Sequence, residues 1–344
     1  MKINFHDHQR DHDPRHFLSS GAARANPETP GRIDALLAGA AQLNVQVSPP
    51  DDHGLAPIAA VHTPEYLSFL QTIHTRWQRI DGASEEVIPN IHPDRRHAGY
   101  PKSAVGQAGY HMADTACPIS AQTWSSAYWA AQTAVAAAER IINGEPSTYA
   151  LCRPPGHHAF ADMAGGFCFL NNTAIAAEHC LRAGRRPAIV DVDLHHGNGT
   201  QGIFYDRDDV LTVSVHADPE RYYPFFWGYA QERGAGPGLG ANLNLPIPRG
   251  SGDDVFIKAL TTGLARVQAY AADVLIIALG LDAFVGDPFA GLAVTTPGFA
   301  RIADACASLN LPTVIVQEGG YLCPELGDNL SAFLNGFVNG HHVG

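Results

Sequence analysis

The sequence has few charged residues and no long apolar run, and both shortages restrict what the chain can be. Charged side chains make up 16% of the 344 residues, against 45% hydrophobic ones. This balance is typical of a globular protein with a large core and not of a disordered or nucleic-acid-coating chain. No stretch approaches the roughly 20 apolar residues of a membrane-spanning helix. We therefore expect a globular protein with neither a nucleic-acid nor a membrane partner.

The sequence also lacks any C-x-x-C pair. Its six cysteines are irregularly spaced, and several stand within apolar runs, which favours free thiols in a reducing compartment. Residues 1–15 are rich in His, Asp and Arg and contain no apolar core, unlike a signal peptide or membrane anchor. These features predict a cytoplasmic location. The net charge of −12 disfavours a phosphate-backbone partner and is compatible with small cationic substrates.

No internal repeat is visible, and we expect one catalytic domain over residues 1–344. The second half alternates strand and helix patterns, which predicts an α/β fold with a mostly parallel sheet between helices. The predicted strands are 148–152, 187–192, 210–215, 273–279 and 312–316, and the predicted helices are 32–42, a segment after Thr63, 123–143, 171–183, 253–272 and 297–309.

Two segments show no periodicity. Residues 15–30 are polar with Gly and Pro, and we predict a loop there. Residues 81–102 form a Pro-rich stretch that is long for a loop in a compact domain. Such loops usually serve function or interaction, although a disordered insertion explains the pattern too.

Polar residues follow four of the predicted strands. The densest group is in residues 187–199 (PAIVDVDLHHGNG), where a buried strand leads directly into acidic and imidazole side chains. In open α/β sheets, ligands bind at the carboxyl ends of strands. The residues concerned are Arg153, His157 and His158, then Asp191, Asp193 and His195, then Asp282, and finally Glu318 and Tyr321.

Asp193 and His195 stand two residues apart in an extended segment, where alternate side chains share a face. With Asp282 as a third ligand, they would hold a metal ion and leave a position open for water and substrate. An isolated Asp-x-His equally fits a hydrogen-bonded loop pair. The coincidence with a third acid at another strand end favours the metal site.

His157 and His158 follow a loop stiffened by two prolines, and paired imidazoles near a metal suit acid/base chemistry. Asp191 and Asn198 would orient the two rings. Tyr321, after two glycines, would donate a hydrogen bond to a developing oxyanion. Surface histidines and a core tyrosine are the plain alternatives.

Together these motifs resemble the histone deacetylase superfamily, above all its bacterial acetylpolyamine amidohydrolases. The resemblance implies the arginase/deacetylase fold, a three-layer α/β/α domain. The motifs that carry it occur in the family's order over most of the chain: 153–158, 165–172, 191–200, 280–282 with Asp287 and Pro288, and 318–321.

The resemblance also implies roles. Zn²⁺ would be held by Asp193, His195 and Asp282. His158 would be the general base, assisted by His157 with Asp191, and Tyr321 would polarise the scissile carbonyl. The substrate tunnel would be lined by Gly166, Phe167, Tyr223 and Phe289, and a structural K⁺ or Na⁺ would be bound by Asp191, Asp193, His195, Ser214 and Val215.

The sequence separates this branch from the two-metal arginases of the same fold. Gly197 and Phe284 stand where the arginase motifs have their second carboxylates. A single metal ion is therefore expected, and a Lewis-acid ion with an activated water leads to amide hydrolysis.

Within the deacetylase branch, residues 81–102 are similar to an insertion that pairs subunits and narrows the tunnel, which predicts a homodimer acting on slender small-molecule amides. However, Val105 and Ala116 stand where the polyamine enzymes carry acidic residues at the tunnel mouth. The sequence leaves open whether the substrate is an acetylpolyamine or a neutral small-molecule or xenobiotic amide. A metal-bound binding protein without turnover is a third reading, although it would need neither His158 nor Tyr321.

Overall fold

The computed structural model describes residues 1–94 and 98–341. An eight-stranded sheet runs in the order β4-β1-β5-β10-β9-β6-β7-β8, and every neighbouring pair is parallel. This confirms the predicted mostly parallel sheet. The strands are β1 (Lys2–Asn4), β4 (Val47–Ser48), β5 (Ser147–Ala150), β6 (Pro187–Asp191), β7 (Leu211–Ala217), β8 (Asn242–Ile247), β9 (Val274–Leu279) and β10 (Thr313–Gln317).

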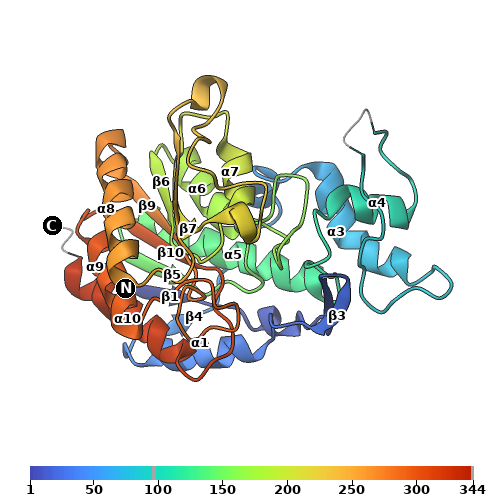
Figure 1. The fold of residues 1–344 in the computed structure, drawn as a ribbon, viewed down its shortest axis with the longest axis horizontal. Coiled ribbons are helices and arrows are strands. Elements are labelled where there is room, and N and C mark those ends of the chain that lie inside the picture. Colours follow the sequence, from blue (N-terminus) through green and yellow to red (C-terminus); the bar gives the residue numbers. More distant parts are fainter. Residues whose placement is uncertain (95–97, 342–344) are drawn as a thin grey trace.

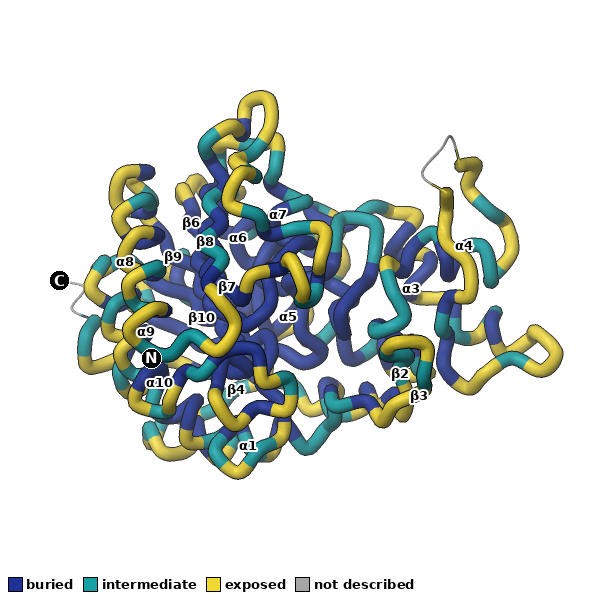
Figure 2. Tube along the Cα trace, viewed as in Figure 1, coloured by how far each residue is buried: buried dark blue, intermediate teal, exposed yellow. Residues whose placement is uncertain are grey.

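Helices cover both faces of this sheet and give three layers (Figure 1). One face packs against α1 (Gly31–Ala41), α8 (Asp253–Tyr270), α9 (Thr296–Ala307) and α10 (Leu326–Gly340). The other packs against α5 (Thr123–Ile142) and α6 (Asn172–Arg182), with α3 (Pro64–Trp77) beyond them. Figure 2 shows the strands between these layers as buried.

The strand β9 shows why its sequence is apolar throughout. Leu275, Ile277 and Leu279 point into one core, and Val274 and Ile276 point into the other. Alternate side chains of a strand face opposite sides, so a strand covered on both faces reads as an uninterrupted apolar run. Burying each of these side chains contributes about 1.5–3 kcal/mol.

The helix α3 begins where the sequence predicts. The Thr63 side chain accepts a hydrogen bond from the Tyr66 backbone N–H, and Pro64 occupies the first turn. Such a cap satisfies one of the unpaired N–H groups at a helix start, and proline is tolerated there because its missing N–H has no partner to lose. The predicted helices are all present, with ends displaced by one or two residues.

The predicted loop at 15–30 is wrong over part of its length. An antiparallel hairpin forms there from β2 (His16–Ser19) and β3 (Ala22–Ala25). Ser20 and Gly21 connect the strands with φ of 51° and 78°, the left-handed conformation that two-residue hairpin turns use. The hairpin is largely exposed, so its strands lack the apolar alternation by which a half-buried strand is recognised.

Further elements of the described chain were not predicted: β4, β8, α2 (Ala56–Ala59), α4 (Ala104–His111), α7 (Asn198–Phe204) and α10. In α10, glycines replace larger residues where helices touch, because a side chain on Gly336 would meet the backbone of Ala300. Packing therefore overrides the low helix propensity of its glycines and asparagines.

The described residues of the 81–102 segment contain no helix and only a single bridge, between Val87 and Ile119. Residues 95–97 of the segment lie outside the described part. The segment lies with α3 and α4 at the end of the molecule opposite α8 and α9 (Figure 1). Among the described helices, none has the length and apolar character required to cross a bilayer.

Candidate metal and catalytic centre

The four strands that carry the polar motifs are neighbours at the middle of the sheet. Their order is β5, β10, β9 and β6, and because all are parallel, their carboxyl ends meet at one edge. The loop after β5 brings His157 and His158, β6 and its extension bring Asp193 and His195, and the other two strands lead to Asp282 and Tyr321. A crevice at this edge is where an open α/β sheet places its ligand.

Asp193, His195 and Asp282 form a buried cluster whose potential ligand atoms all lie within 4.8 Å of one another. His195 Nδ1 is 3.3 Å from Asp193 Oδ1 and 3.1 Å from Asp282 Oδ2. Backbone N–H groups hold the remaining oxygens: Leu194 donates to Asp282 Oδ1 at 3.0 Å and Gly319 to Asp193 Oδ2 at 2.9 Å. Two carboxylates and one imidazole directed at a common point fit the donor set of a catalytic zinc.

The charges in this cluster also call for a cation. Burial and the Asp193 carboxylate raise the pKa of Asp282. Burial lowers the pKa of His195, but hydrogen bonds to Asp193 and Asp282 outweigh it and raise that pKa to about 9. Two buried carboxylates facing one imidazole leave negative charge uncompensated, and a divalent ion would neutralise it.

Gly319 makes the close packing of the cluster possible. A Cβ atom there would lie 2.4 Å from an oxygen of Asp282 and 2.5 Å from an oxygen of Asp193. Because no side chain is tolerated at such distances, the packing of the cluster explains why residue 319 is a glycine.

The two neighbouring histidines have different partners and therefore different charges. His157 Nδ1 is 2.9 Å from Asp191 Oδ2, whereas His158 Nδ1 is 2.7 Å from the amide oxygen of Asn198. Burial lowers the pKa of both rings, but Asp193 and Asp191 raise that of His157 to about 10. For His158, the nearby His157 and His195 add to burial, and its pKa falls well below the ordinary value. These opposite shifts favour the protonated form of His157 and the neutral form of His158.

Because Asn198 accepts the Nδ1 proton of His158, the Nε2 lone pair of His158 remains available for a proton. A cavity of about 440 Å³ opens from His158 and the metal cluster to the surface. Such a neutral, buried imidazole beside a cavity is suited to general base catalysis.

Aromatic rings form the walls of this cavity. Phe289 and Phe167 lie edge-on to Tyr321, at 4.7 and 5.8 Å between ring centroids, and Tyr223 lies edge-on to His158 at 4.9 Å. Gly166 has φ of +48°, and a Cβ atom there would meet His158 and Tyr223. Burial raises the pKa of Tyr321 well above its ordinary value, so its phenol remains a hydrogen-bond donor.

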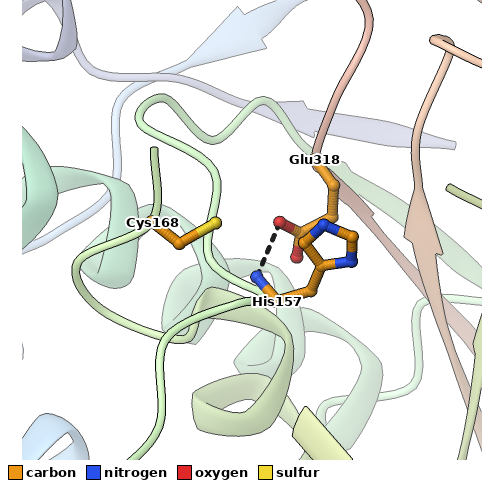
Figure 3. Close-up of side chains that lie close together, drawn as sticks. All are labelled: His157, Cys168 and Glu318. Atoms are coloured by element: carbon orange, nitrogen blue, oxygen red, sulfur yellow. Dashed lines mark hydrogen bonds between the residues drawn. The ribbon is translucent and has the colours of Figure 1, made fainter. Parts of the chain in front are cut away.

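A second buried group, His157, Cys168 and Glu318, lies next to the first (Figure 3). Glu318 Oε2 accepts hydrogen bonds from the backbone N–H groups of Gly156 and His157, at 2.6 and 3.0 Å, and Oε1 accepts one from the Thr173 hydroxyl at 2.6 Å. Burial also raises the pKa of the Cys168 thiol well above its ordinary value. A protonated thiol and a carboxylate filled with donors make a brace for the histidine loop, not a metal site.

A buried ion network supports the tyrosine loop. The Glu28 carboxylate accepts hydrogen bonds from Arg32 at 2.6 Å and Arg153 at 2.8 Å. Arg32 also donates to the Gly320 carbonyl at 2.5 Å, and its guanidinium lies 4.9 Å from the Tyr321 ring centroid. All three charged side chains are buried. The network thereby fixes the backbone next to Tyr321.

Sequence reasoning missed the roles of Glu318, Glu28 and Arg32. The position of Glu318 directly after a strand was a usable signal, but Glu28 lies in the segment predicted as a loop and Arg32 within a predicted helix. Their partners are too distant in the sequence to be read from it: Arg32 and Gly320 are 288 positions apart.

The residues implied for a monovalent cation lie on β6, its extension and β7. Asp191 and Ser214 are paired in register, and both line a cavity of about 10 Å³. The Ser214 hydroxyl is 2.8 Å from His216 Nδ1. His196, which had no predicted role, borders the same cavity and leaves its buried Nδ1 without a partner.

Gly197, which argued for a single metal ion, fills a tight position. A Cβ atom there would lie 2.3 Å from Asp191 Oδ2 and 3.2 Å from His157 Nδ1. A carboxylate side chain at this position is incompatible with the His157–Asp191 pair.

The two positions without the expected acids are placed differently. Ala116 lines the cavity, whereas Val105 is half-buried on α4 and packs against the core around α3 and α5. Asp114, which sequence reasoning did not single out, also lines the cavity.

Comparison with known proteins bears on both fold and centre. Residues 26–337 match the histone deacetylase domain family. The chain is 46% identical to an acetylpolyamine amidohydrolase of Burkholderia pseudomallei over 98% of each chain. It is 43% identical to acetylpolyamine amidohydrolase 1 of Pseudomonas aeruginosa over 97% of each chain.

A crystal structure of acetylpolyamine aminohydrolase from Burkholderia pseudomallei matches this structure with a TM-score of 0.96 and 46% identity, over 99% of this chain and 100% of that one. The likeness confirms the predicted three-layer arginase/deacetylase fold.

Proposed function

The chain belongs to the histone deacetylase domain family, and on that premise we propose that it is a metal-dependent amidohydrolase that deacylates small N-acyl amines, acetylpolyamines in particular. One observation carries the proposal. Asp193 and His195, which form a buried cluster with Asp282, line a cavity that His158 and Tyr321 also line. Relatives at 43% and 46% identity are named acetylpolyamine amidohydrolases.

We assign the metal ion, one Zn²⁺ per chain, to Asp193, His195 and Asp282. When bound, the ion would act as a Lewis acid toward the amide carbonyl and would activate a water molecule. The donor set is compatible with other divalent metals, because in-cell occupancy depends on availability as well as affinity.

His158 takes the proton of the attacking water at Nε2 and later delivers it to the nitrogen of the leaving amine. Asn198 supports this role because it holds the ring in one tautomer. His157 with Asp191 contributes a fixed positive charge beside the reacting groups, and this charge keeps a second proton off His158.

Tyr321 donates its hydroxyl proton in a hydrogen bond to the carbonyl oxygen as negative charge develops there. A donor held in place before the reaction stabilises the transition state more than the substrate. The ring is held by Phe167 and Phe289 on the cavity side and by Arg32 behind it.

Gly166, Phe167, Tyr223 and Phe289 line the path to these groups, and the proposal is that they admit a slender, linear N-acyl chain. The absence of acidic side chains at Val105 and Ala116 favours a second candidate, the same hydrolysis on a neutral amide. The relatives' names favour the acetylpolyamine.

The test uses the purified, zinc-loaded chain with acetylputrescine, acetylcadaverine and a fluorogenic acetyl-lysine amide, with and without a chelator. Turnover that the chelator abolishes is expected on at least one diamine derivative. Absent turnover on all three, or turnover insensitive to the chelator, would refute the proposed function. His158→Ala is the inactive control. Full activity in that variant would indicate that the chain binds metal without catalysis and that a contaminating enzyme produces the measured turnover.

We also propose that the chain is a homodimer formed through residues 81–102. Large apolar side chains of this segment are exposed, with Ile91 at 59% and Tyr100 at 47%, and exposed apolar groups in a non-periodic segment suit an interface. Light scattering of the full chain and of Ile91→Asp tests this: a monomeric wild type would exclude it.

We propose two further assignments, a structural cation and a cellular location. A structural K⁺ or Na⁺ would lie between Asp191 and Ser214, with backbone carbonyls of Asp193, His195 and Val215; activity that is independent of both ions after exhaustive dialysis would contradict it. A cytoplasmic location is supported by the six free cysteines, which favour a reducing compartment, and is tested by cell fractionation.

A further inference from the structure

One acidic side chain lines the tunnel outside the metal cluster. Of the charged carboxylates on the cavity wall, Asp193 belongs to the cluster, and the other is Asp114. Asp114 is half-buried and stands two positions before Ala116, one of the two places where the mouth lacks an expected acid. Arg221 is the guanidinium on the same lining, and it is exposed.

The Asp114 carboxylate is held in place by three neutral donors. Its Oδ2 accepts hydrogen bonds from the Tyr223 hydroxyl at 2.7 Å and the Gly166 N–H at 3.1 Å, and its Oδ1 accepts one from the Ala116 N–H at 2.8 Å. In the described part of the chain, no Lys, Arg or His forms an ion pair with it. Neutral donors orient a carboxylate but do not cancel its charge.

The rest of the outer tunnel is mostly apolar. Apart from the metal cluster, aromatic and aliphatic side chains line much of the same cavity, among them Phe17, Leu18, Phe167, Tyr223 and Phe225. A carboxylate in such a setting loses hydration without gaining a counter-ion, and a cationic nitrogen entering the tunnel would supply one. Nearby aromatic faces would attract the same cation. The exposed Arg221 opposes it only through solvent, where salt screens the repulsion.

One side chain connects Asp114 with His158. The ring of Tyr223 packs edge-on to His158 at 4.9 Å, and the hydroxyl of the same ring donates a hydrogen bond to Asp114. The carboxylate is therefore separated from the proposed general base by a single tyrosine side chain. A cation that binds it must be joined by a short chain to the amide undergoing hydrolysis.

We propose that Asp114 is the specificity residue for the amine end of the substrate: it binds the second, protonated nitrogen of an N-acyl diamine while the amide lies at the metal cluster. The inference rests on the proposed function and deepens it. It restores to the tunnel the negative charge that the residues at positions 105 and 116 do not provide.

A purely structural role for Asp114 is the competing explanation, since the side chain joins three segments of the wall. Two substitutions separate the roles. Asp114→Asn removes the charge and retains an oxygen acceptor, whereas Tyr223→Phe removes one of the hydrogen bonds and retains the charge. If Asp114 only braces the wall, both substitutions should lower activity on charged and neutral substrates alike. If Asp114 recognises the charge of the substrate, only Asp114→Asn should reduce the preference for the charged substrate.

The experiment compares acetylcadaverine with N-hexylacetamide, which has a methyl group in place of the ammonium group. For the wild type, we expect kcat/KM to favour acetylcadaverine about tenfold or more, and we expect Asp114→Asn to lower this value about ten- to a hundredfold, mainly through KM. N-hexylacetamide should respond little to that substitution. Tyr223→Phe should leave the ratio of the two substrates unchanged.

Equal losses on both substrates in Asp114→Asn would overturn the proposal in favour of a brace, and so would a wild type without preference for the charged substrate. That second comparison needs no variant and holds even where Asp114→Asn fails to fold. Cadaverine binding to the zinc-loaded wild type and to Asp114→Asn, measured by calorimetry, is independent of turnover: a weaker variant by about tenfold supports the proposal, and equal affinities refute it. Absent turnover with intact, Asp114-dependent binding would count against the proposed function alone.

Discussion

Replacing Asn198 by Asp should raise the pKa of His158, the proposed general base, so that its ring becomes protonated. The two histidines of the centre differ in a single partner: a carboxylate, Asp191, faces His157, and an amide, Asn198, faces His158. Asp and Asn have nearly the same shape, so the substitution changes charge and leaves packing almost unaltered. Residue 198 also begins the helix α7, where a negative charge is favourable.

The size of the effect follows from the neighbouring pair. An opposite charge within hydrogen-bond reach raises the pKa of a histidine by about 1–3 units, and carboxylates already hold the pKa of His157 at about 10 despite its burial. The pKa of His158 lies well below its ordinary value and should rise in the variant. A base whose pKa is raised is protonated, and thus inactive, up to a higher pH. The acid limb of the rate profile must therefore move to higher pH.

The assay is kcat/KM for acetylcadaverine as a function of pH, in the zinc-loaded wild type and Asn198→Asp. We expect the acid limb of the variant about 1–3 pH units higher, with a tenfold loss of rate for each unit below the new pKa. Asn198→Ser is the matched control because it removes the amide without adding charge. That variant should lose rate without the upward displacement.

An Asn198→Asp profile whose acid limb coincides with that of the wild type would refute the reasoning. So would a limb displaced to lower pH. Either result would mean that His158 is not the group whose protonation limits the reaction, and that the difference between Asp191 and Asn198 has no catalytic meaning.

Three further predictions concern the tyrosine, the metal cluster and the buried network. Tyr321→Phe should lower kcat about 10²–10³-fold and change KM little, because the lost hydrogen bond forms as charge develops; steady-state kinetics on acetylcadaverine measures both constants, and an unchanged kcat would contradict the role. Asp282→Asn should bind less than one equivalent of zinc by elemental analysis after dialysis, whereas a full equivalent would exclude Asp282 as a ligand. Arg32→Met should destabilise the fold by about 3–5 kcal/mol in urea unfolding, since removing one partner leaves the buried Glu28 charge incompletely compensated; Arg32→Lys, which retains the charge, should lose less.

The part of the fold that follows from the sequence is the part buried on both faces. In β9, six consecutive residues are buried, and such a run identifies a central strand without knowledge of its neighbours. The exposed hairpin of β2 and β3 has no comparable signal, because neither face is filled by a core. For α10, local preference and tertiary packing point in opposite directions. Its glycines argue against a helix, and contacts with α1 and α9 explain them.

The same division applies to the centre. Asp193, His195 and Asp282 could be picked out because each follows an apolar strand, and parallel strands share one edge. Glu318 and Arg32 act through partners on other segments: Glu318 binds the backbone of His157, 161 positions away, and Arg32 binds the carbonyl of Gly320. No spacing in the sequence reports such contacts. Residues that touch the reaction were therefore easier to predict than residues that hold them in place.

Asp114 shows why the charge preference of the tunnel cannot be predicted only from the positions that align with the acidic residues of related enzymes. Val105 and Ala116 occupy the places of the expected acids, and on that basis the sequence argues for a neutral substrate. However, a cationic nitrogen is attracted by any carboxylate close to it in the tunnel, whichever segment of the chain carries that carboxylate. Asp114 reaches the wall from the same loop as Ala116, and the hydroxyl of Tyr223 helps to orient its carboxylate. A carboxylate moved by two positions can thus serve the same electrostatic purpose, because the backbone N–H groups of Gly166 and Ala116 hold it on the cavity wall even without the Tyr223 hydroxyl.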